Sequence, residues 1–149
     1  MNSRKLARLI YPEFRFGRTD PEQALALVRL GVGGFCFYGG KAAEVYETSR
    51  LLKAASETPL IIASDYENGA GQWVAGATEL PSNMALGASG SEALARRKGE
   101  ITALEAKAMG VDWIFAPVAD LASRPDNPIV NVRAYGADRR LAARLAGAY

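Results

Sequence analysis

The fold is decided by the stretch Pro59-Leu60-Ile61-Ile62-Ala63-Ser64-Asp65-Tyr66-Glu67-Asn68-Gly69. Its first six residues form an almost continuous apolar run, which is typical of a strand covered on both faces. Asp65 follows at the end of this run, and Gly69 and Gly71 give the next segment the freedom to approach a ligand closely. We therefore predict a buried strand over 59–64 with a carboxylate at its carboxyl end.

Helix-like and strand-like segments alternate on both sides of this stretch. Further strands are predicted over 34–38 and 111–116, and helices from an N-cap at Asp20 to Gly31, over 41–56, from a cap at Ser89 or Ser91 to Met109, and from an N-cap at Asp138 onward. A short amphipathic segment is predicted over 1–10, with Leu6, Leu9 and Ile10 on one face. Helical spacing assigns a buried side to each of the four helices. These sides are Leu25, Val28 and Leu30 in the helix after Asp20; Ala42, Val45, Ser49 and Leu52 in the helix over 41–56; Leu94, Ile101, Leu104 and Ala108 in the helix that ends at Met109; and Leu141, Leu145 and Ala148 in the helix after Asp138. This succession predicts an α/β fold with a parallel sheet and crossover helices.

The connecting segments are unequal in length. Those that enter strands are short, whereas those that leave two of the strands are long, about 25 residues over 65–90 and about 20 over 117–137. Long loops at the carboxyl ends of parallel strands are where α/β proteins build their sites, and we expect Asp65 and Asp120 at that same end. A (β/α)8 barrel needs about 200 residues or more. We therefore interpret residues 1–149 as one partial domain, the N-terminal portion of a TIM-like barrel that continues beyond residue 149. A small doubly wound domain is the alternative.

Composition excludes several classes of function. The chain has no histidine, which excludes Ser-His-Asp and Cys-His catalysis and His-ligated metal sites among these residues. Its 18 basic and 16 acidic residues leave a net charge of +2 without a basic stripe, so we expect no nucleic-acid partner. Neither a signal segment nor a membrane span is evident, and the single cysteine, Cys36, fits a reducing compartment. We expect a cytoplasmic location and no membrane partner.

Three residues after the 59–64 strand are candidates for a ligand site. Asp65 is placed to bind a ligand, although capping its own loop is an equal alternative. Glu67 could pair with Asp65, but accepting backbone N–H bonds within the loop is the favoured role. Trp73 could stack on a sugar ring or act as a lid over the core.

The second long loop carries two more candidates. Arg133 offers a planar, permanently charged group that could hold hydroxyls or a carboxylate. Its alternative is a surface ion pair with Asp126 or Asp138. Asp120 could reach the same cleft, but capping the 121–123 turn is the favoured role.

At this point the chain resembles glycoside hydrolase family 3. The resemblance covers nearly the whole chain and rests on five stretches in order: Gly31-Val32-Gly33-Gly34-Phe35, residues 59–69, Leu80-Pro81-Ser82-Asn83-Met84-Ala85-Leu86-Gly87-Ala88, Phe115-Ala116-Pro117-Val118-Ala119-Asp120, and Asn127-Pro128-Ile129-Val130-Asn131-Val132-Arg133-Ala134-Tyr135-Gly136-Ala137-Asp138. The pattern is most similar to the bacterial β-N-acetylhexosaminidase and β-glucosidase branches. Asn68, Gly71 and Trp73 depart from the family pattern D-x-E-G-G-x-V-x-R, and Trp73 stands where a second sugar-binding arginine is common.

The resemblance implies a retaining glycosidase acting on β-linked, non-reducing-end sugars in a TIM-like barrel, without a cofactor or metal. It implies that Asp65 and Arg133 bind the terminal sugar, with Trp73 and Asp120 as weaker candidates. The nucleophile and the acid/base group lie later in such proteins, so no catalytic residue is expected within 1–149, and this segment alone should be inactive. A non-catalytic carbohydrate-binding or interaction domain, derived from a barrel half, is the alternative.

The expected partners are a carbohydrate and either the rest of the barrel or a second copy of the chain. An incomplete sheet leaves a bare edge, and the last helix is predicted to leave an apolar face with Leu141, Leu145 and Tyr149 uncovered.

Overall fold

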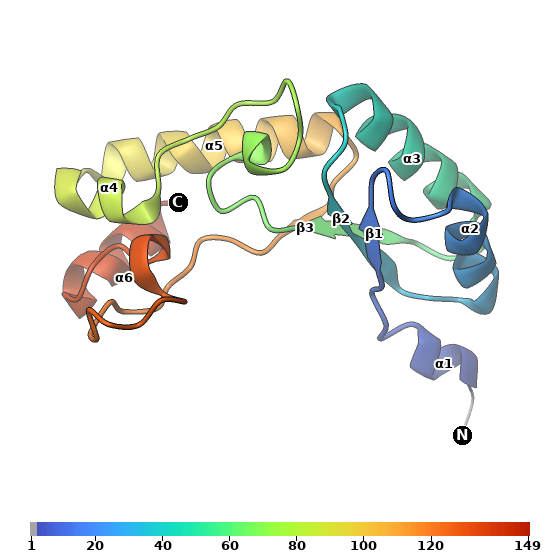
Figure 1. Ribbon diagram of the computed structural model, residues 1–149, viewed down its shortest axis with the longest axis horizontal. Coiled ribbons are helices and arrows are strands. Elements are labelled where there is room, and N and C mark those ends of the chain that lie inside the picture. Colours follow the sequence, from blue (N-terminus) through green and yellow to red (C-terminus); the bar gives the residue numbers. More distant parts are fainter. Residues whose placement is uncertain (1–2) are drawn as a thin grey trace.

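The computed structural model describes residues 3–149, which form a parallel sheet with helices (Figure 1). The four strands are β1 (Glu13–Arg15), β2 (Gly34–Tyr38), β3 (Ile61–Ser64) and β4 (Trp113–Ile114). They lie in the order β1-β2-β3-β4, and every neighbouring pair is parallel. The three predicted strands are thus confirmed as parallel neighbours. The sequence prediction missed β1, because this three-residue strand carries charged residues on either side of Phe14 and shows no apolar run.

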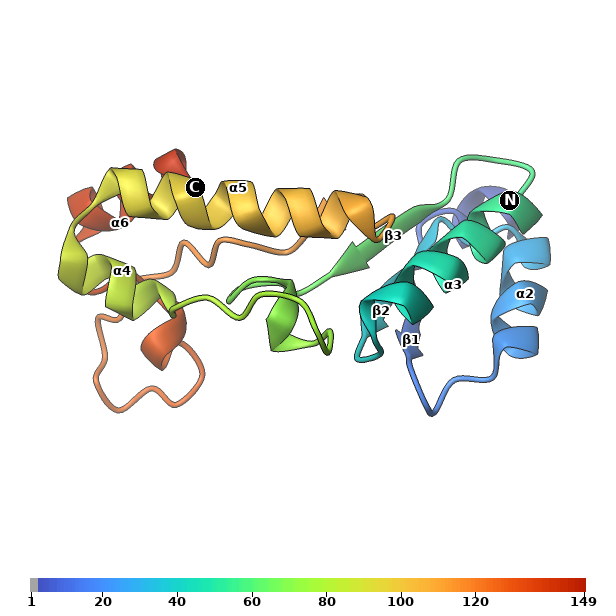
Figure 2. The ribbon, with the colours of Figure 1, turned by 90° about the horizontal axis from the view of Figure 1, so that it is seen from above.

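The helices gather at two places. They are α1 (Ser3–Ala7), α2 (Pro21–Leu30), α3 (Ala42–Ala55), α4 (Asn83–Ser89), α5 (Glu92–Ala108) and α6 (Arg139–Ala148), with short 3-10 turns η1 (Ala70–Gln72) and η2 (Asn131–Arg133). Helices α2 and α3 lie against the sheet, and α5 runs along the molecule from the sheet to a second group formed with α4 and α6 (Figure 2). The chain therefore crosses between the two groups in the segments after β3 and after β4.

The two faces of the sheet differ in character. Phe14, Phe35, Phe37 and Ile62 share the face covered by α2 and α3 and belong to the larger core, together with Val28 of α2 and with residues of α3. The alternate residues point to the other face, where Glu13, Cys36, Ala63 and Trp113 are in register across the four strands. Arg15 and Tyr38 form the next layer on this face, and Asp65, two residues after Ala63, belongs to the same layer because side chains alternate with period two. In a (β/α)8 barrel the side chains on the inner face of the sheet stack in layers of this kind. The face with Cys36, Tyr38 and Asp65 therefore corresponds to the barrel interior.

The predicted buried face is right for α2 except at its end and wrong for α5. On α2, Val28 is buried as predicted and Leu25 packs against the main core. Leu30 of α2 is 64% exposed, and on α5 Leu94 and Leu104 are 53% and 66% exposed. The buried residues of α5 are instead Ala95, Lys98, Gly99, Thr102 and Ala106. Small residues are buried on this face of α5 because they let the end of α6 pack closely against it. A Cβ at Gly99 would collide with the carbonyl group of Tyr149. The residues predicted for α3, Val45, Ser49 and Leu52, are buried as expected.

The chain ends also differ from prediction. The predicted apolar face at the N-terminus, Leu6, Leu9 and Ile10, is exposed, and Met1 and Asn2 lie outside the described residues. At the other end Leu145 is fully buried in a second core with Leu86 and Tyr135. Its assignment to the buried side of the helix is thus confirmed, and the expectation of an uncovered apolar face that includes Leu145 is wrong.

The predicted loop over 65–90 contains a helix, α4. Ser82 caps its start by accepting a hydrogen bond from the Ala85 N–H, and Gly90 ends it in a left-handed conformation. Ser89 therefore closes α4, and it is Ser91 that caps α5. The helix was missed because seven residues provide two turns at most, too few for a clear apolar period.

Candidate functional site

Asp65 lies at the carboxyl end of β3 and is held at both its side chain and its backbone. The Tyr38 hydroxyl donates to Asp65 Oδ2 at 2.9 Å, as the register of β2 and β3 allows. The indole Nε1 of Trp73 donates to the Asp65 carbonyl oxygen at 3.1 Å. Oδ1 of Asp65 makes no hydrogen bond to residues 3–149, and this half-buried carboxylate therefore keeps one oxygen for a ligand.

A cation lies against the two aromatic rings beside Asp65. The Tyr38 and Trp73 rings meet edge to face with their centroids 5.0 Å apart. Arg15 Cζ lies 5.0 Å from the Tyr38 centroid and 5.8 Å from that of Trp73. Glu13 holds the guanidinium, accepting from Nε at 3.1 Å and from Nη2 at 3.0 Å. This hydrogen bonding raises the pKa of Arg15 and lowers that of Glu13.

Arg133 is fixed by Glu67 from the other long loop. Its Nε donates to Glu67 Oε2 at 2.8 Å and its Nη2 to Oε1 at 2.7 Å. The Glu67 hydrogen bond raises the pKa of Arg133, and the nearby charges of Asp65 and Asp120 add to the effect. The structure thus brings both long loops together at the carboxyl ends of the strands, with the Arg133 guanidinium within the electrostatic reach of Asp65.

These contacts correct two expectations. Arg133 pairs with neither Asp126 nor Asp138: Asp126 pairs with Arg124, and Asp138 caps α6. Glu67 has the structural role that we favoured, but it accepts from the Arg133 guanidinium rather than from backbone N–H groups.

The backbone of Arg133 is supported by a buried lysine that the sequence did not indicate. Asn83 of α4 donates from Nδ2 to the Arg133 carbonyl oxygen at 2.9 Å. Lys98 of α5 donates to Asn83 Oδ1 at 2.9 Å and to the Pro81 carbonyl at 2.8 Å. Lys98 is only 3% exposed, and burial lowers its pKa to about 8 against the opposing effect of the Glu67 charge. Asn83 lies within one of the family-like stretches, which is the signal that could have found it.

The two weaker candidates take different places. Trp73 packs partly against the main core and touches Tyr38, so it combines the lid role with a position beside Asp65. Asp120 is exposed in the segment after β4 and accepts no hydrogen bond from residues 3–149, so it does not cap the 121–123 turn. Its charge acts on Arg133, which places it on the same side as the site.

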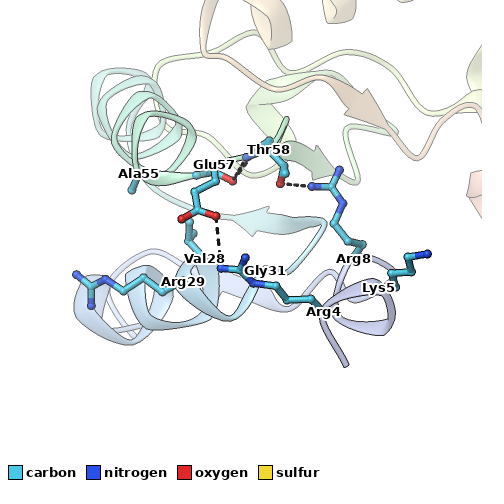
Figure 3. A pocket seen from close by; sticks show the side chains of 10 residues that line it. Arg4, Lys5, Arg8, Val28, Arg29, Gly31, Ala55, Glu57 and Thr58 are labelled. Atoms are coloured by element: carbon cyan, nitrogen blue, oxygen red, sulfur yellow. Dashed lines mark hydrogen bonds and ion pairs between the residues drawn. The ribbon is translucent and has the colours of Figure 1, made fainter. Parts of the chain in front are cut away.

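A separate hollow of about 380 Å³ lies at the amino end of the sheet, between α1, the end of α2 and the turn before β3 (Figure 3). Arg4 reaches Glu57 across it at 3.4 Å, and Arg8 donates to the Thr58 hydroxyl and to the Pro59 carbonyl. These contacts attach α1 to the body of the protein. Since Thr58 precedes β3 and Asp65 follows it, this hollow is at the opposite end from the site.

The fold and the site together define a class: the amino-terminal strands of a (β/α) barrel whose carboxyl-end loops carry a paired Glu67–Arg133 and an oriented Asp65. The model of the glycosyl hydrolase family 3 N-terminal domain matches residues 2–149. The chain belongs to glycoside hydrolase family 3.

Curated relatives agree with this family. The chain is 39% identical over 132 residues to a β-N-acetylglucosaminidase/β-glucosidase of Cellulomonas fimi, covering 88% of this chain and 23% of that protein. It is 31% identical over 149 residues to a β-hexosaminidase of Neisseria meningitidis serogroup C (strain 053442), covering 93% of this chain and 41% of that protein. The chain therefore spans well under half the length of these relatives.

Solved structures give the same result. A β-glucoside phosphorylase bound to 2FGlc superposes with a TM-score of 0.93 at 32% identity, covering 100% of this chain and 27% of the other. A family 3 β-N-acetylglucosaminidase from Paenibacillus sp. str. FPU-7 gives a TM-score of 0.88 at 31% identity, covering 99% and 30%. These matches confirm the predicted portion of a TIM-like barrel. In the part of the chain that the structure describes, no helix is long and apolar enough to cross a membrane.

Proposed function

We propose that residues 1–149 supply part of the sugar-binding site of a retaining glycoside hydrolase. Its substrates are β-linked, non-reducing-end sugars, of the β-N-acetylhexosaminide or β-glucoside type. The observation that carries the proposal is the Glu67–Arg133 pair, because it holds the Arg133 guanidinium at the strand ends where Asp65 is oriented. The names of the relatives support the substrate class.

Each residue has a distinct task in this proposal. Asp65 accepts a hydrogen bond from a sugar hydroxyl through its open Oδ1. Arg133, whose side chain is 43% exposed, donates to the same sugar while Glu67 fixes the plane of its guanidinium. Charge-assisted hydrogen bonds of this kind contribute about 1.5–3 kcal/mol each. Trp73 and Asp120 lie at the edge of the sugar site and contribute less to binding.

The bond-breaking groups belong to the part of the barrel that follows these residues. An aspartate nucleophile forms a covalent glycosyl-enzyme, and an acid/base group assists attack by water on it, as the family resemblance implies. In this proposal residues 1–149 carry neither group, and the purified segment releases no p-nitrophenol from an aryl glycoside.

The test uses the complete protein that carries this chain, with p-nitrophenyl β-N-acetylglucosaminide and β-glucoside. Asp65→Ala should lower kcat/KM by roughly one to two orders of magnitude. Asp126→Ala, in an exposed ion pair, is the matched control and should leave it unchanged. If kcat/KM of the Asp65→Ala variant stays within about twofold of wild type, Asp65 does not bind the sugar.

A second candidate, transfer of the glycosyl group to phosphate, is favoured by the superposition on a β-glucoside phosphorylase. The glycosyl-enzyme would then react with phosphate, giving a glycosyl phosphate in place of the free sugar. Turnover in the presence and absence of inorganic phosphate, with the product sugar identified, separates the two reactions. Release of the free sugar at the same rate in both supports the hydrolase.

The non-catalytic alternative is decided by the same preparation. Binding of glucose or N-acetylglucosamine without turnover of either aryl glycoside would favour a carbohydrate-binding domain over an enzyme. The cytoplasmic location stays a prediction, made from the sequence because no signal segment is evident in it and because the single cysteine fits a reducing compartment.

A further inference from the structure

Three side chains from three separate segments converge on Asp65. Tyr38, at the end of β2, holds the carboxylate, and Trp73, after η1, holds the carbonyl oxygen of the same residue. Arg15, at the end of β1, lies against both aromatic rings. Asp65 is therefore fixed at two points by rings that are themselves packed edge to face under one cation.

The hydrogen bonds from Cys36 to Tyr38 and from Tyr38 to Asp65 form a chain in which each group donates to the next. The Cys36 thiol donates to the Tyr38 oxygen at 3.1 Å, so the Tyr38 proton is directed to Asp65 Oδ2. Burial, together with the bonds to Cys36 and Asp65, raises the pKa of Tyr38 well above its ordinary value. The hydroxyl is therefore protonated and a hydrogen-bond donor at neutral pH.

We propose that Tyr38 is a positioning residue for the sugar-binding carboxylate: its hydroxyl occupies Asp65 Oδ2 and turns Oδ1 toward the ligand. Without this donor the carboxylate could rotate, and part of the free energy of binding would be lost in ordering it. Arg15 acts one step further away by holding the Tyr38 ring, because a cation over an aromatic face is attracted to it. The inference rests on the proposed function of Asp65 in sugar binding.

The experiment is a double-mutant cycle in the complete protein that carries this chain, with the better of the two p-nitrophenyl glycosides. Tyr38→Phe removes the hydroxyl and keeps the ring, and it is measured alone and combined with Asp65→Ala. Alone, it should lower kcat/KM by about fivefold to tenfold, mainly through KM, since the lost bond orients a group that binds the ground state as well. Combined with Asp65→Ala, it should cost less than about twofold, because its target is already gone.

Tyr46→Phe is the matched control, since it removes the same hydroxyl from an exposed residue of α3 and should leave kcat/KM unchanged. If Tyr38→Phe fails to fold, Arg15→Met takes its place in the cycle, with an expected loss of about threefold that again disappears with Asp65→Ala.

The outcomes distinguish the positioning role of Tyr38 from the proposed sugar binding by Asp65. An equal loss with and without Asp65→Ala would show that Tyr38 supports the fold generally, and no loss in either background would show that it does nothing for Asp65. Both results overturn the positioning role and leave the sugar site intact. A neutral Asp65→Ala would instead overturn the proposed function, and the positioning role with it.

Discussion

Glu67 and Arg133 stand 66 positions apart in the chain and meet through two parallel hydrogen bonds of 2.8 and 2.7 Å. The carboxylate is buried at 9% exposure, whereas the guanidinium reaches solvent. Glu67 lies on the segment that leaves β3, and Arg133 on η2, which packs against α4. The pair therefore joins the sheet to the second group of helices at the point where the site is formed.

The two halves of this pair should differ in their importance for stability. Arg133→Met leaves a buried carboxylate without its partner and should lower the free energy of unfolding by about 1–3 kcal/mol. Glu67→Gln should cost less, because the Arg133 guanidinium can be hydrated where it stands. Urea unfolding of the complete protein measures both. Arg124→Met, which breaks the exposed pair with Asp126, is the control. A greater loss for Glu67→Gln than for Arg133→Met would contradict this explanation.

The position of Asp65 could be predicted from the sequence because it depends on a local pattern. An apolar run followed by a carboxylate places that carboxylate at a strand end, and parallel strands place their carboxyl ends together. The pairing of Glu67 with Arg133 could not be predicted in this way. Both residues lie in long loops, where no alternation or register relates one position to another.

The support beneath the site escaped prediction for a different reason. Helical periodicity counts apolar residues, and on α5 it selects the stripe through Leu94 and Leu104, which is exposed. Lys98 is buried instead, because Asn83 and the Pro81 carbonyl satisfy its ammonium group. A charged residue whose burial depends on distant oxygen atoms leaves no mark in the local pattern.

Close packing of α4 depends on Gly87. A Cβ at this position would collide with the carbonyl group of Tyr135, two residues from Arg133. Gly87→Ala should therefore lower the free energy of unfolding of the complete protein by about 1–3 kcal/mol, because the backbone at Tyr135, just after η2, has to move. Gly147→Ala is the matched control: nothing lies near its added methyl group, and in α6 the change should be neutral or stabilising by up to about 1 kcal/mol. Equal melting temperatures for the two variants would contradict the packing argument.

The segment of residues 1–149 should self-associate when prepared alone. Within residues 3–149, β4 pairs only with β3, and Trp113 and Phe115 are exposed beside its open edge. Sedimentation at concentrations on the order of tens of micromolar should show species larger than a monomer. Trp113→Glu should shift the distribution toward the monomer, whereas Leu104→Glu on α5 should not. A monomer in every preparation would exclude the open edge as an association surface.

The buried Lys98 gives stability a dependence on alkaline pH. Its pKa is about 8 in the folded protein, because burial disfavours the ammonium form, and 10.5 is the ordinary value in an unfolded chain. Below pH 8 the group is protonated in both states, and the folded state bears the full cost of the buried charge. Between pH 8 and 10.5 the unfolded state binds more protons, so this contribution to the free energy of unfolding rises with pH and then becomes constant.

Buried tyrosines change the free energy of unfolding in the opposite direction as pH rises. Their contribution has to be subtracted to isolate that of Lys98. The pKa values of Tyr66 and Tyr135 are raised to about 12, mainly by burial, so their contributions are lost as pH rises above 10. Wild type and Lys98→Met of the complete protein share these tyrosines, and the difference between their unfolding free energies isolates Lys98. From pH 8 to 10.5 this difference should move in favour of wild type by on the order of 2–3 kcal/mol. Urea unfolding at half-unit steps of pH checks this, and a difference that stays constant over the range would show that Lys98 keeps an ordinary pKa in the folded protein.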